Sequence, residues 1–422
     1  MRINNKNNRF EKITLVYLLI MGVFSCYLEH NEIWNVILLL DFFLLFLLSR
    51  DYRKSLAANT KMLFLIPILF VYVFLNVLQT SEYTYLVGNM LSIIKVLIIS
   101  LLLIGISFEK NDIMNKFLKK SFVFINLVWI FNIIALVLQT NGSGFMIKDS
   151  WLSINSFYKD HCSGIFGNSG THILSAFSIF IFIYNFWYSK ESKKIWIKIY
   201  TIVTAIIMML LSTLNDNNAI FVLYGLFAIY YLFKKFFYNN KNMQTIVMKT
   251  ISVIVLMTVT AIVIIYIPVV NNYIKNELQK RVDSIVNVQS TEALGSNERL
   301  AIVEYATRKG FGLKFGTGLG AWPLTKPDYL GFAHFGLSSI GAFVSLGGFI
   351  FYLIILIIYT NLLTSRIKKG FVAILDKAYG VFMLVVLSIY TIIFTSGIIM
   401  LWIVLAFIIF DLLSRQKSKD DF

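Results

Sequence analysis

Residues 121–139, SFVFINLVWIFNIIALVLQ, carry no charged side chain over 19 consecutive positions. An α-helix rises by about 1.5 Å per residue, so this run is about as long as the hydrocarbon core of a bilayer is thick. Apolar runs of near-spanning length recur along the whole chain, at 13–29, 33–49, 62–79, 86–107, 121–139, 171–188, 196–214, 218–233, 250–270, 337–363, 378–394 and 397–413. The sequence therefore predicts an all-α polytopic membrane protein with about 12 transmembrane helices.

The composition of the chain supports this fold class. Of its 422 residues, 58% are hydrophobic and only 14% are charged, whereas about a quarter of the residues in a soluble domain are charged. The first apolar run lacks a small-residue cleavage site, so we expect a membrane span rather than a removed signal peptide. Cys26 and Cys162 are too few for a disulfide framework or a cysteine-based metal site, and neither metal nor cofactor is expected.

Lys and Arg are distributed unevenly between the two sides of the predicted membrane. With a cytoplasmic N-terminus, seven cytoplasmic segments hold 27 of the 38 Lys and Arg residues, namely 1–12, 50–61, 108–120, 189–198, 234–249, 364–377 and 414–422. Because positive charge accumulates on the cytoplasmic side, we expect a multi-pass protein of the cell (cytoplasmic) membrane with both termini in the cytoplasm. The net charge of +16 is expected to face anionic lipid and not nucleic acid.

The longest predicted loop divides the chain into three parts: helices 1–9 with an outer loop at 140–170 (1–270), the loop itself (271–336), and helices 10–12 with a cytoplasmic tail (337–422). The long loop is extracytoplasmic in this orientation and still contains eight Lys and Arg residues. A loop of about 66 residues can cross a membrane despite such charge. We therefore expect its cations to bind an anionic ligand. Its first part has apolar residues at helical spacing, which predicts an amphipathic helix at the membrane surface or against the bundle.

Three cations lie in a second predicted helix of this loop, which starts near Asn297. Arg299 lies in the first turn, where the helix dipole disfavours a cation, and no acidic residue follows it three or four positions later. Arg299 is therefore a candidate functional residue. Arg308 and Lys309 suit the last turn of the helix, and Arg308 has Glu304 four positions earlier, so a structural role is their alternative.

A glycine-rich segment, GFGLKFGTGLGAWP, follows this helix. Glycines such as Gly316, Gly318 and Gly320 let a backbone approach a ligand and turn its N–H groups toward an anion. A tight turn that leads back to the tenth span is the alternative. The segment lacks the Gly-Lys-Ser/Thr end of a nucleotide-binding P-loop. Lys314 and Trp322 fit both interpretations, with Trp322 as an interfacial anchor or as a platform for a sugar ring.

Histidines flank two predicted spans on the extracytoplasmic side. His334 precedes the tenth span and, as a neutral imidazole, could accept a proton from a hydroxyl group. His161 and His172 flank a Gly- and Asn-containing turn before the sixth span, but two histidines without cysteine or carboxylate partners are a weak metal signal. Asn168 in this turn offers hydrogen bonds for sugar hydroxyls, and a turn that caps the following helix is the alternative.

Two ionisable residues, Asp41 and Lys95, lie within predicted spans. A charge inside a bilayer is costly, so such residues are functional candidates by default. A structural pair between these two residues is the alternative.

Three stretches of the chain resemble the O-antigen polymerase and ligase superfamily, which includes the Wzy-type capsular and cell-surface polysaccharide polymerases. NERLAIVEYATRKGFGLKFGTGLGAW is similar to the Arg-containing helix and G-x-G-x-G turn of that family. AHFGLSSIGAFVSLGGFIFYLIIL resembles its Ala-His pair and a span with a Gly-Gly-aromatic centre. GIFGNSGTHILSAF resembles its Gly-rich turn before the sixth span, and twelve spans with a long loop between the ninth and tenth also match.

The resemblance implies a GT-C-like fold and a metal-independent glycosyltransferase. Its donor would be an undecaprenyl-diphosphate-linked oligosaccharide, and a polymerase would move the growing glycan onto a lipid-linked repeat unit at the outer face of the cytoplasmic membrane. On this resemblance, Arg299 contacts the diphosphate and His334 deprotonates the acceptor hydroxyl. A chain-length regulator would be a further candidate partner.

Two positions depart from the family pattern. Asn217 and Asn218 stand where the family often has a Ser-Arg pair, so a second arginine clamp is not expected there. Phe335 follows His334 where the ligase branch often has Asn, which weakens the assignment of the base and favours a polymerase.

Other functions stay open at this point. A ligase that moves finished glycan to another acceptor would use the same donor. A flippase or transporter would show internal repeats and charged or broken helices at mid-bilayer. The sequence shows no convincing repeat, and its polar residues concentrate in the extracytoplasmic loops, which favours catalysis at a membrane surface.

Overall fold

The computed structural model describes residues 2–24, 32–57, 60–79, 83–109, 111–146, 162–166, 171–214, 219–239, 316, 318–320, 338–364 and 371–390. Within these ranges the chain is helical and contains no strand. The elements are α1 (Arg2–Val23), α3 (Glu32–Leu48), α4 (Arg50–Ala57), α5 (Thr60–Gln79), α6 (Leu86–Glu109), α7 (Asn111–Thr140), the 3₁₀ turn η2 (Gly164–Phe166), α9 (Thr171–Ser192), α10 (Ile195–Leu214), α11 (Ala219–Asn239), α15 (Ser339–Thr364) and α16 (Phe371–Tyr390).

The predicted apolar runs coincide with these helices wherever the structure describes them. Lys116–Thr140, Ile195–Ser212 and Ser339–Asn361 are each long and apolar enough to cross a membrane. Shorter apolar helical stretches lie in α1, α3, α5, α6 and α11. The runs at 250–270 and 397–413 lie outside the described residues, so the predicted number of spans and the GT-C-like arrangement stay predictions. The residues that the structure describes are thus those of a helical protein, and some of its helices are long and apolar enough to cross a membrane.

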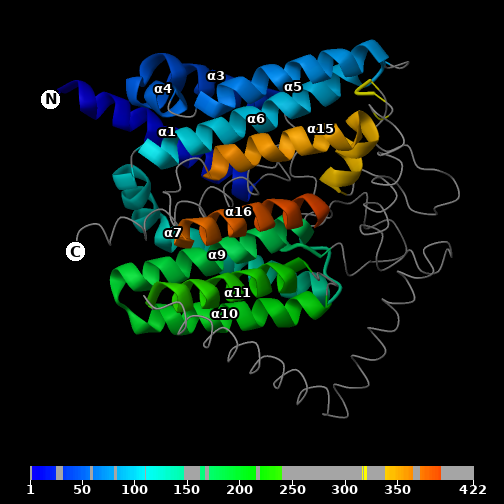
Figure 1. Ribbon diagram of the computed structural model, residues 1–422. Helices are drawn as coiled ribbons and strands as arrows, with labels where there is room; N and C mark the ends of the chain where they lie inside the picture. Colours follow the sequence, from blue (N-terminus) through cyan, green and yellow to red (C-terminus); the bar gives the residue numbers. More distant parts are fainter. Residues whose placement is uncertain are drawn as a thin grey trace, which may run out of the picture.

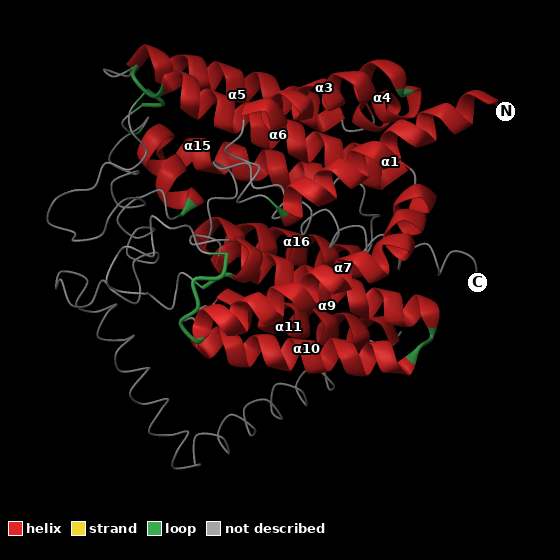
Figure 2. Cartoon of the chain, turned by 180° about the vertical axis from the view of Figure 1, so that it is seen from behind, coloured by secondary structure: helices red, strands yellow, loops and turns green. Residues whose placement is uncertain are grey.

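The helices form two groups that lie side by side (Figures 1 and 2). One group contains α1, α3, α4, α5, α6 and α15, and the other contains α7, α9, α10, α11 and α16. The groups meet where α15 packs on α16 and where α1 and α6 pack on α7. The start of α1 and the short helix α4 lie at one end of the bundle, and residues 316 and 318–320 (yellow in Figure 1) lie at the opposite end.

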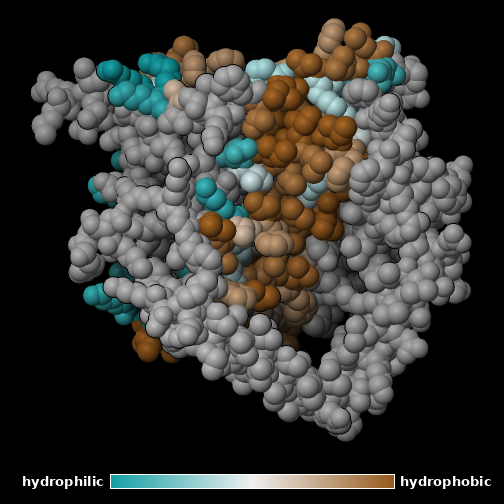
Figure 3. Space-filling view, in the orientation of Figure 1, coloured by the Kyte–Doolittle hydropathy of each residue, from teal (hydrophilic) through white to brown (hydrophobic). Residues whose placement is uncertain are grey.

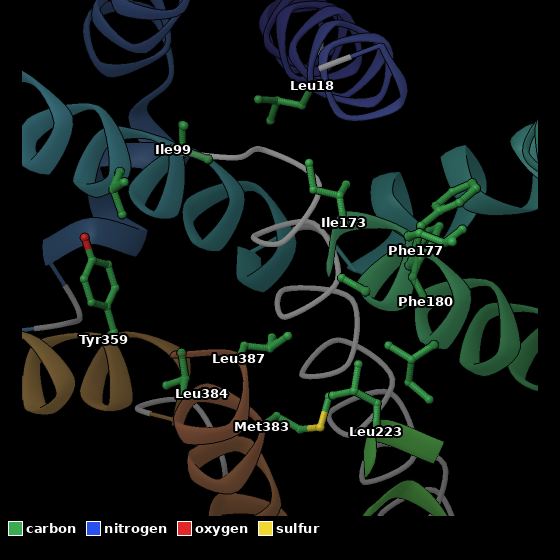
Figure 4. Packing of buried hydrophobic residues seen from close by; sticks show 14 of the residues in the cluster. Leu18, Ile99, Ile173, Phe177, Phe180, Leu223, Tyr359, Met383, Leu384 and Leu387 are labelled. Carbon is green, nitrogen blue, oxygen red and sulfur yellow. The ribbon is translucent and has the colours of Figure 1, made fainter. Parts of the chain in front are cut away.

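The seam between the two groups is filled by apolar side chains (Figure 4). Leu18 of α1 and Ile99 of α6 come from one group, Ile173 of α9 and Leu384 and Leu387 of α16 come from the other, and all of them are less than a tenth exposed. Lipid is as apolar as these side chains, so their contribution to helix association comes from close packing more than from the hydrophobic effect.

The outer surface of the bundle is also apolar. Large side chains remain exposed on several helices, among them Ile195 (72%), Val87 (69%), Leu47 (66%) and Val123 (65%). In Figure 3 the described hydrophobic residues gather over the middle of the visible face, while hydrophilic residues lie mostly toward its edges. Such a band is too large for a water-exposed surface and fits contact with lipid chains.

A buried ion pair joins α11 to α16. The Lys234 Nζ atom lies 2.9 Å from Asp376 Oδ1, and the Tyr230 hydroxyl donates to the same oxygen at 2.8 Å. Asp376 is fully buried, and Tyr379 stacks on Tyr230 with ring centroids 4.2 Å apart. A buried charge pair of this kind fixes which helices face each other, because losing either partner leaves the other charge uncompensated.

Candidate functional site

Helix α15 is broken in its first half, at Gly348. Gly348 has φ 81° and ψ 172°, which no helical residue adopts, so Ser339–Thr364 is two helical segments across a kink. Carbonyl groups in the last turn before such a break lose their helical partners. Inside a protein they need others, since an unpaired buried carbonyl is costly.

The glycine turn, which we define as residues 316 and 318–320, supplies one of these partners. The Gly318 N–H donates to the Leu346 carbonyl at 2.9 Å. The Asn76 side chain of α5 donates to the same carbonyl at 3.2 Å, and the Tyr72 hydroxyl donates to the Gly347 carbonyl at 2.7 Å. The break and the glycine turn thus form one hydrogen-bonded unit.

Helices α5 and α6 hold the other side of the glycine turn. The Leu319 N–H donates to Asn76 Oδ1 at 2.8 Å, and the Asn89 side chain of α6 donates to the Leu319 carbonyl at 2.7 Å. The Tyr85 N–H donates to the Gly320 carbonyl at 3.0 Å. Leu319 itself is fully buried. Asn76 is the central residue, because its one amide group bonds both the turn and the broken helix.

The glycines are required by this close approach. Gly316 has φ 65°, and a Cβ atom there would lie 2.5 Å from the Ser345 carbonyl oxygen. Gly318 has φ 96°, which also disfavours any side chain. At Gly347 a Cβ atom would overlap the ring of Phe351. The sequence allows two interpretations of the glycines, and these positions show a tightly packed turn.

Two backbone N–H groups of the turn are already used inside the protein. The N–H groups of Gly318 and Leu319 already donate to the Leu346 carbonyl and to Asn76. They are therefore not directed toward a ligand. The role of the glycine turn at these two groups is to fix the chain against α5 and α15.

The structure places only some of the predicted site residues. Gly316, Gly318 and Gly320 come together in the glycine turn, and His172 lies in the first turn of α9 in the other helix group. The remaining candidates lie outside the described residues: Arg299, Arg308, Lys309, Lys314, Trp322, His161, Asn168 and His334. Their roles stay predictions.

The chain on both sides of Trp322 and His334 is nevertheless fixed. On one side of the segment 321–337, the Gly320 carbonyl accepts a hydrogen bond from Tyr85, the residue that precedes α6. On the other side, the fully buried Ser338 donates its hydroxyl to the Ser388 carbonyl of α16 at 3.1 Å. The segment that carries the predicted base therefore starts and ends on the bundle.

Asp41 and Lys95, the two ionisable residues within predicted spans, do not form the structural pair that is the alternative to a functional role. Asp41 Oδ1 accepts a hydrogen bond from Thr14 of α1 at 2.8 Å. Lys95 lies partly buried on α6. Over the ranges that the structure covers, His, Cys, Asp and Glu do not gather in any group of three or more that could hold a metal ion.

Asn76, Asn89, Tyr72 and Tyr85 were missed by sequence analysis. A signal did exist, since Asn76 interrupts an otherwise apolar helix and an amide at such a position needs a partner inside the membrane. The helix breaks at the Gly347–Gly348 pair. This pair is part of the Gly-Gly-aromatic centre that the family resemblance rests on, but the resemblance does not predict a break there.

Comparison of the chain with protein-family models, with curated proteins and with solved structures gives no match.

Proposed function

We propose that this protein is a metal-independent membrane glycosyltransferase, a polysaccharide polymerase that uses undecaprenyl-diphosphate-linked oligosaccharides at the outer face of the cytoplasmic membrane. The observation that supports it best is the docking of the glycine turn onto the break in α15, at the end of the bundle opposite α4. Non-helical backbone at membrane depth occurs only where it is buried in protein or lines a cavity.

The docked glycine turn attaches the neighbouring chain to the helix bundle. Lys314 precedes the turn by two residues, and Trp322 follows it by two. His334 lies four residues before the buried Ser338. A loop tied to the bundle at these points can hold cations, an aromatic ring and a base near the membrane surface, where a lipid-linked sugar would bind.

The proposed reaction needs these residue types. The bond between the anomeric carbon and the diphosphate oxygen breaks, and its electron pair leaves with the diphosphate. The acceptor hydroxyl oxygen bonds to the anomeric carbon, and its proton passes to the imidazole of His334. Arg299 balances the charge that develops on the diphosphate, for which a bidentate guanidinium is better suited than an ammonium group.

A flippase or transporter is the second candidate, and the break in α15 is the observation that favours it. Transporters bind ions and substrates at discontinuous helices, through carbonyl groups that unwinding has exposed. Here the carbonyls of Leu346 and Gly347 accept hydrogen bonds from Gly318, Asn76 and Tyr72. Carbonyls used in this way serve to hold the turn, which supports the transferase over the transporter.

Analysis of lipid-linked glycans in a strain that lacks the protein tests the proposal. A polymerase predicts that single repeat units accumulate, and the wild-type gene should restore long polymer. Long chains left on the lipid carrier would instead show a ligase, and units trapped on the cytoplasmic face would show a flippase.

Arg299→Lys tests the diphosphate contact in protein shown to be inserted at wild-type level. We expect most polymer to be lost, because Lys keeps the charge and loses the bidentate donor geometry. Lys326→Arg, in the same loop, is the control and should keep polymer length. Normal polymer from Arg299→Lys would contradict the role of Arg299.

A further inference from the structure

A second polar cluster lies away from the glycine turn, where α1, α3 and α4 meet. Thr14 of α1 is fully buried and donates its hydroxyl to Asp41 Oδ1 of α3 at 2.8 Å. Tyr52 of α4 is only 2% exposed. Its ring packs edge-on against Phe42, the residue next to Asp41, with centroids 6.4 Å apart. The hydrogen bond joins Thr14 directly to Asp41, and the ring contact places Tyr52 against the neighbouring position of α3.

Two oxygen atoms of this cluster have no hydrogen-bond partner. They are Asp41 Oδ2 and the Tyr52 hydroxyl oxygen, and both are buried. The carboxylate and the phenol do not bond to each other directly. Groups that are buried, polar and unpaired in this way call for a bound species that the protein atoms do not supply.

Asp41 interacts electrostatically with the phenol of Tyr52. Burial, and then the negative charge of Asp41, raise the pKa of Tyr52 well above its ordinary value. Tyr52 therefore stays a neutral phenol at physiological pH and offers an uncharged oxygen. Tyr17, which lies three residues after Thr14 on α1, is also within electrostatic reach of Asp41.

The neighbouring arginine does not neutralise this carboxylate. Arg53 follows Tyr52 in α4, and its guanidinium donates to the carbonyls of Phe46 and Leu47. These carbonyls belong to the last turn of α3, where a cation is favoured by the helix dipole. The Arg53 guanidinium therefore binds carbonyl groups at the end of α3 and not the Asp41 carboxylate.

We propose that Asp41, Thr14 and Tyr52 bind one monovalent alkali cation between α1, α3 and α4. Hard cations take oxygen ligands, and carboxylate and hydroxyl oxygens are what this cluster offers. A single carboxylate balances one positive charge, whereas Ca²⁺ or Mg²⁺ would keep an uncompensated charge in a buried place. The bound ion would satisfy Oδ2 and the Tyr52 oxygen together and would tie α4 to the spans α1 and α3.

Thermal unfolding of the purified full-length protein in detergent tests this site. NaCl, KCl and N-methyl-D-glucamine chloride are compared at equal ionic strength, because a ligand that binds only the folded state raises the Tm with its concentration. For the wild type we expect a saturable rise of about 2–4 °C with Na⁺ or K⁺ over the bulky organic cation. The difference between the Na⁺ and K⁺ arms identifies the preferred ion.

Two substitutions locate the effect. Asp41→Asn keeps the shape of the side chain and removes the charge, so the ion-dependent rise should disappear. Tyr52→Phe keeps the carboxylate and removes one ligand, so the salt concentration at half-maximal shift should increase about tenfold. Tyr200→Phe is the matched control, since the Tyr200 hydroxyl is also buried and unpaired but lies on α10. It should titrate like the wild type.

Equal Tm in all three salts would overturn the proposal and would show that water or a cation of the protein itself completes the cluster. A rise that persists in Asp41→Asn would place the ion elsewhere. If Asp41→Asn does not fold, the Tyr52→Phe titration decides alone, and an unchanged midpoint contradicts the site. The measurement does not use enzymatic activity, so its result is independent of the proposed polymerase.

Discussion

At the scale of single residues, Asn76 is the key polar group of the candidate site. Its side chain accepts from the Leu319 N–H and donates to the Leu346 carbonyl. A sequence alone predicts that an asparagine in an apolar helix needs a partner, but not which one. Here the partners are more than 200 residues away along the chain, with separations of 243 and 270. Hydropathy patterns carry no information about such contacts.

Asn76→Leu should loosen the glycine turn. The Leu319 N–H loses its acceptor and stays buried, which costs about 1–3 kcal/mol of unfolding free energy. Thermal unfolding measures the stability, and reaction of Leu319→Cys with a thiol reagent measures the exposure of the turn. We expect faster reaction in the Asn76→Leu background. Asn361→Leu is the control, because the Asn361 side chain donates to the Ile357 carbonyl of its own helix, and an equal effect there would contradict the role of Asn76.

We predict that replacing glycine by alanine has opposite effects on stability at Gly316 and at Gly225. Gly316→Ala places a Cβ atom against the Ser345 carbonyl at a positive φ and should destabilise the protein by about 1–3 kcal/mol. Gly225 lies inside α11, and nothing lies within 4 Å of a Cβ atom there. Gly225→Ala should therefore stabilise the protein by about 0.5–1 kcal/mol. Thermal unfolding distinguishes the two signs, and a neutral Gly316→Ala would show that the turn is not tightly docked.

At the scale of helices, hydropathy predicted position and length well and contacts poorly. The uncharged run 121–139 lies within α7, and the apolar part of that helix runs from Lys116 to Thr140. The predicted span at 378–394 belongs to α16, which starts already at Phe371. The sequence predicts a cytoplasmic segment at 364–377, which includes Asp376, but Asp376 is buried against Lys234 and can continue the helix because its charge is paired.

The Lys234–Asp376 pair predicts strong coupling between α11 and α16. Asp376→Asn leaves a buried ammonium group without its counter-charge and should cost about 3–5 kcal/mol. The double variant Lys234→Met, Asp376→Leu removes both charges and should recover most of that loss. Thermal unfolding of the single and double variants gives the coupling energy.

The exposed pair Lys119–Glu191 is the matched control for this cycle. Its side chains are 45% and 43% exposed, and its two charges lie 2.9 Å apart. Water screens such a pair, so Glu191→Gln should cost at most about 1 kcal/mol. A loss in Asp376→Asn no larger than that control would mean that the buried pair does not hold α11 to α16.

At the scale of the whole molecule, the basic segments and the glycine turn lie at opposite ends of the bundle. The basic helix α4 and the start of α1 lie at one end, and the glycine turn lies at the other (Figure 1). From the positive-inside rule we expect the first end to be cytoplasmic, and this orientation stays a prediction. The sequence could predict this division because it depends on charge along the chain. It could not predict the two helix groups, which depend on contacts between distant segments.

Labelling of single cysteines in intact cells tests the orientation. The native Cys26 and Cys162 are first replaced by Ser. Lys54→Cys then places an exposed thiol on α4, and Tyr83→Cys places one just before α6, where Tyr83 is 58% exposed. A membrane-impermeant thiol reagent should label Tyr83→Cys in intact cells and Lys54→Cys only after permeabilisation. The reverse pattern would put the glycine turn on the cytoplasmic side, where the proposed lipid-linked donor could not be used at the outer face, and equal labelling of both would contradict a fixed orientation.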